Sequence, residues 1–404
     1  MMMRRLMPAA LGAIFAIVPL FPSFIALTGV GIPGVTILPR SVTLAVFGFC
    51  ALLGLYALAV FARFPARGSQ PLLLPLAAVF GAGVVAGIAG FDPVAGLLFT
   101  GIGGMGIIWH ASVVRFYADR YAAVTIYWSL LLSGALAIVA AIVMVAVRFP
   151  PAAYAIAHGR ATGTFVLPGE LAGYLIVITP IAYALGRVAQ TRALRSLGWI
   201  VLGLGFVALA MTYSRAGWMG AAAAFAFLFA TGRRRSLGAA IAVVLGGIIA
   251  VALLFNAHHD PSEDYTRLSI WQAALGIANR FPLTGVGPFN FSRLYALVRA
   301  PDADATAFHA HSLYLTFFVE FGIAGVAAVV WTMWRFASEL RRRVAVAPPS
   351  QGFLALAIAA GLVGVAVQGL IDTVTVVIFG LWMAIMGLAL AAARGGDPRP
   401  TIDG

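Results

Sequence analysis

The feature that most constrains this chain is a series of long runs in which apolar residues occupy every face of a helix. A soluble helix buries one apolar stripe and keeps a polar face, and these runs have no polar face. Each is close to the roughly 20 residues that an α-helix needs to cross a hydrocarbon core about 30 Å thick. With 62% hydrophobic and 10% charged residues, the chain is expected to be an all-α polytopic integral membrane protein.

The runs predict about 12 transmembrane helices within a single integral membrane domain, residues 1–404. The expected spans lie near 8–28, 42–62, 72–90, 95–112, 123–147, 171–186, 199–213, 217–231, 237–256, 312–334, 352–371 and 374–393. The first run is too long for the apolar part of a typical signal peptide, so we interpret it as a retained helix. Residues 257–311 are expected to form one large loop that contains short helices.

The arginines predict how the spans are oriented. All 26 basic residues are arginine, and the expected loops divide them 18 to 8. The rich loops are short, so the positive-inside rule assigns them and both termini to the cytoplasm. The segments 148–170 and 257–311 then face the periplasm, and they contain five of the six histidines: His158, His258, His259, His309 and His311. Because the charge follows membrane topology, we do not expect a nucleic-acid partner.

Three arginines on the predicted periplasmic side are candidates for anion binding. Arg215 lies between two apolar runs, where it could anchor the helix ends at the membrane surface or face a polar cavity. Arg160 lies in a Gly-, Thr- and Pro-rich loop expected to fold back toward the membrane, and it could equally be a solvated loop residue. Arg267 is expected at the start of an amphipathic helix with apolar residues at 268, 271, 274, 275 and 278. There it could bind phosphate, together with the helix N-terminus, or offset Glu263 and Asp264.

His309 and His311 permit three interpretations. On an extended loop they would point to one side and could bind a metal with ligands from the set His258, His259, Asp302 and Asp304, although no HExxH-type spacing supports this. They could also be structural imidazoles at the membrane interface. The third interpretation, which we favour, is proton transfer, since an imidazole can accept a hydroxyl proton near neutral pH. Nearby arginines would favour its neutral form.

Four motifs follow one another on the predicted periplasmic side. They are Arg160-Ala161-Thr162-Gly163-Thr164-Phe165, Tyr213-Ser214-Arg215-Ala216-Gly217-Trp218, Arg267 to Trp271 with Gly285-Val286-Gly287-Pro288-Phe289-Asn290-Phe291, and His311-Ser312 followed by nine residues and Gly322. In this order they resemble the O-antigen ligase family, whose members include related polymerases. The motifs cover residues 150–340. The chain departs from the family pattern at Pro168-Gly169-Glu170 and at Ser312, where the family often has Pro-Asn and Asn.

The resemblance implies a GT-C-like, inverting and metal-independent glycosyltransferase that needs no cofactor. It would transfer a glycan from undecaprenyl pyrophosphate to a sugar hydroxyl of lipid A-core, in the bacterial inner membrane and at its periplasmic face. His311 would be the catalytic base. Arg215, Arg267 and Arg160 would bind the donor pyrophosphate, with His309, Ser312 and Tyr314 supporting the site or the acceptor. We expect a monomer surrounded by membrane lipids.

Two alternatives remain. An O-antigen polymerase or a protein O-oligosaccharyltransferase would use the same donor with another acceptor; the modest length and the lack of a large periplasmic C-terminal domain favour a ligase. A transporter of lipid-linked glycans would have ionisable residues through its central helices. Here Glu320 is the clearest such residue within a span, with His110 and Asp372 near span ends, so the sequence favours catalysis at one face.

Overall fold

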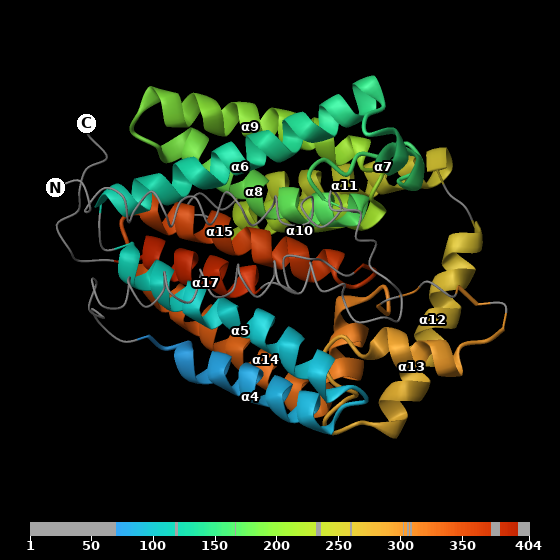
Figure 1. Cartoon of the computed structure of the whole chain (residues 1–404). Helices are drawn as coiled ribbons and strands as arrows, with labels where there is room; N and C mark the ends of the chain where they lie inside the picture. Colours follow the sequence, from blue (N-terminus) through green and yellow to red (C-terminus); the bar gives the residue numbers. More distant parts are fainter. Residues whose placement is uncertain are drawn as a thin grey trace.

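The protein is described by a computed structural model that covers residues 70–117, 120–165, 167–231, 236–258, 261–301, 303–304, 307, 309–372 and 380–394. Every regular element in these ranges is a helix (Figure 1), so the all-α prediction is confirmed for them. The helices are α4 (Leu73–Ala89), α5 (Pro93–Phe116), α6 (Arg120–Val147), α7 (Pro151–Ile156), α8 (Pro168–Val188), α9 (Arg192–Met211), α10 (Arg215–Thr231), α11 (Leu237–His258), α12 (Pro261–Arg280), α13 (Phe291–Val298), α14 (Leu313–Val346), α15 (Pro349–Gln368) and α17 (Leu381–Ala392).

Each span predicted between residues 72 and 393 corresponds to one of these helices. Six of the described helices are long and apolar enough to cross a membrane by length and composition, namely α5, α6, α8, α9, α14 and α15. The helices α4 and α17 and residues 237–253 of α11 are apolar but shorter. Together they indicate a helical polytopic membrane protein. The predicted spans 8–28 and 42–62, and the first residues of span 374–393, lie outside the described residues.

Two helices extend well beyond the spans predicted for them. The helix α9 begins at Arg192, after Thr191, whose hydroxyl accepts a hydrogen bond of 3.4 Å from the Leu194 N–H. The helix α14 continues to Val346 and ends before Pro348. Hydropathy marks only the apolar part of a helix, whereas arginine is a good helix former and lets both helices continue past the apolar run.

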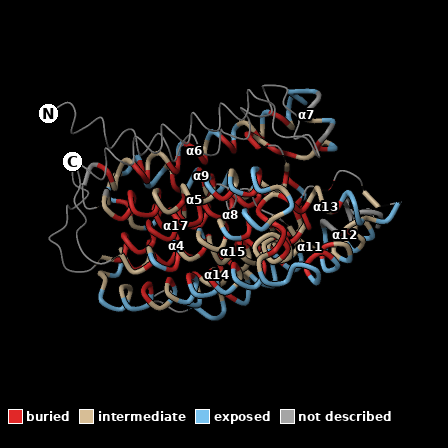
Figure 2. The backbone as a smooth tube through the Cα atoms, turned by 60° about the horizontal axis from the view of Figure 1, so that its bottom comes forward, coloured by how far each residue is buried: buried red, intermediate tan, exposed pale blue. Residues whose placement is uncertain are grey.

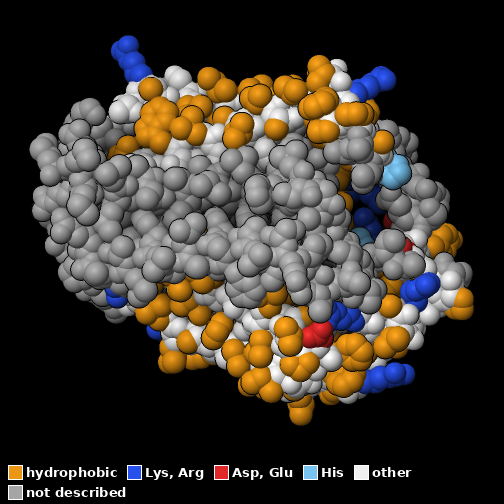
Figure 3. Space-filling model, in the orientation of Figure 1, with side chains coloured by type: hydrophobic (Ala, Val, Ile, Leu, Met, Phe, Trp, Pro, Cys, Tyr) orange, Lys and Arg blue, Asp and Glu red, His pale blue; other side chains and the backbone are white. Residues whose placement is uncertain are grey.

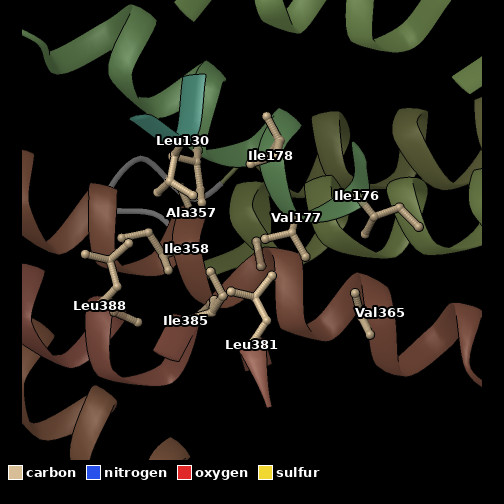
Figure 4. Close-up of a cluster of buried hydrophobic side chains, with 14 of the residues drawn as sticks. Leu130, Ile176, Val177, Ile178, Ala357, Ile358, Val365, Leu381, Ile385 and Leu388 are labelled. Atoms are coloured by element: carbon tan, nitrogen blue, oxygen red, sulfur yellow. The ribbon is translucent and has the colours of Figure 1, made fainter. Parts of the chain in front are cut away.

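The core lies where α8, α15 and α17 pack together, with α6, α9 and α10 around them (Figures 2 and 4). Small residues allow these helices to approach closely, as is usual between membrane helices. A Cβ atom on Gly361 would lie 2.9 Å from the Val177 Cα, and one on Gly364 would lie 2.6 Å from the Gly220 carbonyl oxygen. The large side chains between these close contacts include Ile176, Ile178, Ile358, Leu381, Ile385 and Leu388 (Figure 4).

The helices alternate in direction, so the connections gather at two ends of the bundle (Figure 1). One end, which we call the α12 end, contains α7, α12, α13 and the segment before α14. Long-range backbone hydrogen bonds join its segments: Ala161 to Met211 at 2.9 Å, Phe91 to Val286 at 2.9 Å and Leu313 to Gly369 at 2.8 Å. The arginines of the described residues divide between the two ends as the sequence predicted, and the smaller set lies at the α12 end.

The helix α14 is interrupted at Gly322, which has φ 62° and ψ −169°. The segment 282–287 inserts into this break. The N–H groups of Ile323 and Ala324 donate to the carbonyls of Pro282 and Leu283, at 2.9 and 3.2 Å. The carbonyls that they would contact in an intact helix, those of Val319 and Glu320, instead accept from Val286 and Gly287, at 2.9 and 3.0 Å. All four backbone groups freed by the break are therefore paired, as burial away from water requires.

The break depends on glycine at two positions. Gly322 and Gly285 both have positive φ, and a Cβ on either would overlap the backbone of the opposite segment, at Leu283 and Glu320. We predict that Gly322→Ala lowers the free energy of unfolding by roughly 1–3 kcal/mol or more, because alanine is strained at a positive φ and its Cβ would also overlap the Leu283 backbone. Denaturant unfolding in detergent measures the loss.

The matched control is Gly203→Ala, since Gly203 lies within α9 with nothing within 4 Å of an added Cβ. Alanine there should be neutral or stabilising by up to about 1 kcal/mol. Equal stability of the two variants would contradict the role assigned to the break.

Candidate functional site

Four segments meet at the α12 end of the bundle: residues 157–165, the turn between α9 and α10, the helix α12, and residues 309–313. Figure 3 shows a hollow at this end in which basic, acidic and histidine side chains gather, whereas the described lateral surface is mostly hydrophobic. Charged side chains are costly in the hydrocarbon region, so their concentration here marks the polar site of the molecule.

The loop 157–165 folds back into the bundle, as its composition predicted. Ala161, Thr162 and Phe165 are buried, and Gly163 packs against the Ala137 backbone, ten residues before the end of α6. Arg160 is fixed by this packing: its Nε donates a hydrogen bond of 2.9 Å to the Thr212 carbonyl. Arg160 is therefore bound to the α9–α10 turn and is not a freely solvated loop residue.

Arg215 is the first residue of α10. Ser214 precedes it and caps the helix, because its Oγ accepts a hydrogen bond of 3.0 Å from the Gly217 N–H. The Arg215 side chain is 19% exposed, and its guanidinium lies 3.4 Å from an Asp264 carboxylate oxygen on α12. The structure thus brings Arg215 to the same corner as Arg160, where it contacts an acidic side chain of α12.

The prediction that a helix starts at Arg267 is wrong. The helix α12 begins at Pro261, so Arg267 lies in its second turn, three residues after Asp264, and the free N–H groups of the helix start are not beside its guanidinium. The acidic residues near 263 are part of the helix because acidic side chains are favourable in a first turn. Arg267 remains near the histidines, since its charge acts on both of them.

The helix α12 buries one face, but this face matches the predicted one only in part. Ile270, Ala274, Ile277 and Ala278 are buried, whereas the predicted positions 268 and 275 are half-exposed leucines. The buried stripe packs against α13 and α14 in a small core of its own with Phe291, Tyr295 and Val319. A sequence period gives the spacing of a stripe, and neighbouring elements decide which of two adjacent stripes is buried.

The segment before α14 is held by its neighbours on both sides. Ser312 caps α14, with its Oγ accepting from the Leu315 N–H at 3.5 Å. The Thr316 hydroxyl accepts from the Ala310 N–H at 3.1 Å. The Tyr314 hydroxyl donates to the Ala366 carbonyl at 2.7 Å, which ties the start of α14 to the end of α15. Of the predicted supporting residues, Ser312 and Tyr314 therefore fix the local backbone.

The two histidines are not on an extended strand, as the metal interpretation assumed. His311 has φ 46°, in the left-handed region, and its N–H donates a hydrogen bond of 3.1 Å to Nδ1 of His309. The rings lie 4.5 Å apart between centroids at 68°. Among the described residues, no group of three or more His, Cys, Asp or Glu side chains could hold a metal ion.

Both imidazoles are neutral near physiological pH. Burial, and to a smaller extent the positive charge of Arg267, lower the pKa of His311 to about 4, while Asp304 acts in the opposite direction. Burial lowers the pKa of His309 to about 3, with additional effects of His311 and Arg267. A neutral imidazole has a free ring nitrogen, so His311 can accept a proton.

An apolar cavity of about 1080 Å³ extends from His309 and Ser312 along α14 between α4, α5, α15 and α17. It ends near Trp334 and Ala337. Its polar lining is concentrated near the start of α14, at His309, Ser312, Thr316 and Glu320. The cavity lies on the opposite side of α15 from α8, α9 and α10 (Figure 1), and it meets the polar site at His309 and Ser312, before and at the start of α14.

Several predicted or possible site residues lie elsewhere. His110 is buried in α5, and its Nδ1 lies 2.9 Å from the Met383 carbonyl of α17. His158 is exposed. His259, Asp302 and the side chain of His258 lie outside the described residues.

Sequence reasoning missed two contacts that shape the site. The Glu320 carboxylate accepts hydrogen bonds from the N–H groups of Phe289 and Phe291. At the start of α8, Gly169 leaves room for the Asp372 carboxylate and its carbonyl accepts from the Gln368 Nε2 at 2.8 Å. Gly169, where the chain departs from the family pattern, thus allows α8 to pack against residues 368–372. The only sign of the Glu320 contact in the sequence was an acidic residue within an apolar run.

The fold and the site together define a helical membrane protein with a polar site at one end of its bundle. Residues 200–330 match the family model described as O-antigen ligase, the family that the sequence motifs resemble. The matched region contains Arg215, Arg267, His311 and Gly322, and it supports ligase- or polymerase-type glycosyltransferase function in general. No curated protein matches the chain.

The histidine environment gives a direct prediction. We expect His311 to stay neutral down to pH 5.5, because its pKa is lowered to about 4 from an ordinary value near 6.5. Histidine-selective NMR, assigned with a His311→Gln variant, measures the titration. A His311 midpoint between pH 6 and 7 would contradict the buried, Arg267-adjacent geometry.

Proposed function

We propose that this protein transfers a glycan from undecaprenyl pyrophosphate to a sugar hydroxyl of lipid A-core, with His311 as the base. The observation that carries the proposal is that Arg267 acts on a neutral His311, while Arg215 contacts Asp264, about one turn before Arg267 on α12. A proton acceptor and two guanidinium groups thus lie on separate segments of the chain at the same end of the bundle, which supports one shared site.

The chemistry is a single displacement. His311 takes the proton of the acceptor hydroxyl as the hydroxyl oxygen forms a bond to the anomeric carbon of the donor glycan. The bond between that carbon and the phosphate oxygen breaks, and its electron pair leaves with undecaprenyl pyrophosphate. Attack opposite the leaving group inverts the anomeric configuration. No nucleotide or other cofactor is needed, because the donor linkage itself is activated.

The arginines stabilise the leaving group. A guanidinium is always charged and donates two parallel hydrogen bonds to phosphate oxygens, which allows it to replace a metal ion in this role. Arg215 and Arg267 are the primary candidates, and Arg160 supports them by fixing the α9–α10 turn through Thr212. His309 positions His311 through the hydrogen bond to its backbone.

The apolar cavity fits the hydrocarbon chain of the donor. Its α14 lining runs from Leu313 to Ala337, about 36 Å at 1.5 Å per residue, comparable with a hydrocarbon core roughly 30 Å thick. An ordinary acyl chain crosses only one leaflet, whereas a polyprenyl chain is long enough to fill such a length. The chain begins at the pyrophosphate, so a cavity that starts beside the histidines suits the donor better than the acceptor, whose acyl chains are remote from its reacting sugar.

The membrane orientation follows from the arginines. The α12 end has the smaller set, so the positive-inside rule assigns it to the periplasm. This is where a lipid-linked glycan and lipid A-core would meet. The protein would then lie in the bacterial inner membrane with its site at the periplasmic surface.

The base assignment is tested by His311→Ala, assayed in detergent with purified donor and acceptor. We predict a loss of glycan transfer by roughly 100-fold or more, the usual contribution of a general base. His158→Asn is the control, because His158 is exposed and asparagine tolerates its positive φ. Transfer near the wild-type rate in the His311 variant would remove the base assignment.

Bidentate phosphate binding by Arg215 is tested by Arg215→Lys, which keeps the positive charge but cannot donate two parallel hydrogen bonds from a planar group. We predict a fall in kcat of roughly 100-fold, similar to the loss of one donor to a developing anion. Arg280→Lys, at the exposed end of α12, is the matched control and should transfer normally. Wild-type activity of Arg215→Lys would argue against bidentate phosphate binding.

The acceptor is tested in a deletion strain. Loss of a ligase should leave lipopolysaccharide with bare core on a gel, because no glycan reaches lipid A-core. Loss of a polymerase would instead leave one repeat unit attached to core. Unchanged lipopolysaccharide with loss of glycosylated protein would point to the protein O-oligosaccharyltransferase alternative.

A further inference from the structure

Phe289 has a backbone conformation that a bulky side chain rarely adopts. Its φ is 62°, in the left-handed region normally occupied by glycine or asparagine. Such strain persists only where neighbouring contacts over-determine the backbone, and it is concentrated at functional sites. The contacts around Phe289 therefore indicate what the conformation achieves.

Glu320 of α14 holds this backbone in two ways. Its carboxylate accepts the N–H groups of Phe289 and Phe291, and its main-chain carbonyl accepts the Gly287 N–H at 3.0 Å. Gly285, two residues earlier, packs directly on the Glu320 backbone. One residue next to the α14 break thus fixes the segment on both sides of Phe289.

The strained backbone directs the Phe289 ring into the apolar cavity. The ring stacks on that of Phe99 from α5, with centroids 3.8 Å apart and planes at 16°. Both rings line the cavity, as do Pro288 and His309. Glu320 lies eight residues after Ser312, so this stacked pair is about 12 Å along α14 from the start of the cavity. The pair forms an aromatic wall in the half of the cavity nearest the histidines.

We propose that Phe289, fixed by Glu320 and stacked on Phe99, is a specificity-determining residue that selects an isoprenoid chain next to the pyrophosphate over a saturated chain. This rests on the proposed function, which supplies a lipid pyrophosphate as the donor. Each isoprene unit is planar about its double bond and already partly rigid. It can therefore lie on an aromatic face with less loss of conformational entropy than a saturated chain of equal length.

The experiment compares farnesyl pyrophosphate with dodecyl pyrophosphate, which have the same main-chain length of twelve carbons. Each competes with radiolabelled undecaprenyl pyrophosphate for the purified full chain in lipid nanodiscs, and inorganic pyrophosphate reports binding of the head group alone. For the wild type we expect farnesyl to compete about tenfold better than dodecyl, the size of a single favourable aromatic contact. Equal competition by the two would overturn the proposal.

Phe289→Gly removes the ring and relieves the strained φ. In this variant we expect farnesyl and dodecyl pyrophosphate to compete within about twofold of each other, because the aromatic contact that favours farnesyl is lost. Competition by inorganic pyrophosphate should stay unchanged. Phe289→Asn is the second variant, since asparagine also tolerates the left-handed region. Phe281→Gly removes a partly exposed ring from the same connection and should keep the wild-type preference. A preference retained in Phe289→Gly or Phe289→Asn would overturn the proposal.

Glu320 is tested as a positioning residue. Glu320→Gln keeps an oxygen that can accept the two N–H groups and should restore most of the preference that Glu320→Ala loses. A merely structural role would lower the stability of the alanine variant without changing the farnesyl-to-dodecyl ratio, and that result would overturn the role of Glu320. If the wild type shows the preference but no glycan transfer with any acceptor, the proposed function fails while the chain selectivity stands.

Discussion

The arrangement of the site depends on one exchange of backbone hydrogen bonds. At Gly322 the helix α14 gives up two of its own bonds, and segment 282–287 supplies four replacement partners. Buried backbone groups cannot be left unpaired in a membrane protein, so segment and helix must form together. The exchange fixes a loop to a helix in a buried part of the bundle.

Three consequences follow from this exchange. The segment leads from α12 into α13, so its attachment fixes the position of Arg267 relative to the start of α14. It also carries Phe289 into the cavity through Glu320. The spacing of nine residues between Ser312 and Gly322 sets how far the histidines lie from the break, about 15 Å at 1.5 Å per residue. The spacing between His311-Ser312 and Gly322 in the sequence motif therefore sets the distance from the proposed proton acceptor to the point where the loop is attached.

Much of this could be predicted from the sequence because membrane insertion leaves few choices. Runs of apolar residues gave the helices, and the arginines gave their division between two ends. The candidates Arg160, Arg215 and Arg267 and the two histidines do meet at one end of the bundle. The start of α12 was missed because Pro261, Glu263 and Asp264 look like a polar loop, although they suit a first helical turn. The role of Glu320 was missed because its partners are backbone N–H groups of a segment some 30 residues earlier, and backbone groups leave no trace in a sequence pattern.

The central claim is that His311, Arg215 and Arg267 form one site for a lipid pyrophosphate whose chain fills the apolar cavity. The most direct test is a structure of the full chain in lipid nanodiscs with undecaprenyl pyrophosphate bound. The account predicts pyrophosphate density between Arg215 and Arg267, within reach of His311, and chain density passing Phe289 along α14. Pyrophosphate bound away from these arginines, or a chain that leaves between α9 and α10 with the cavity empty, would contradict it.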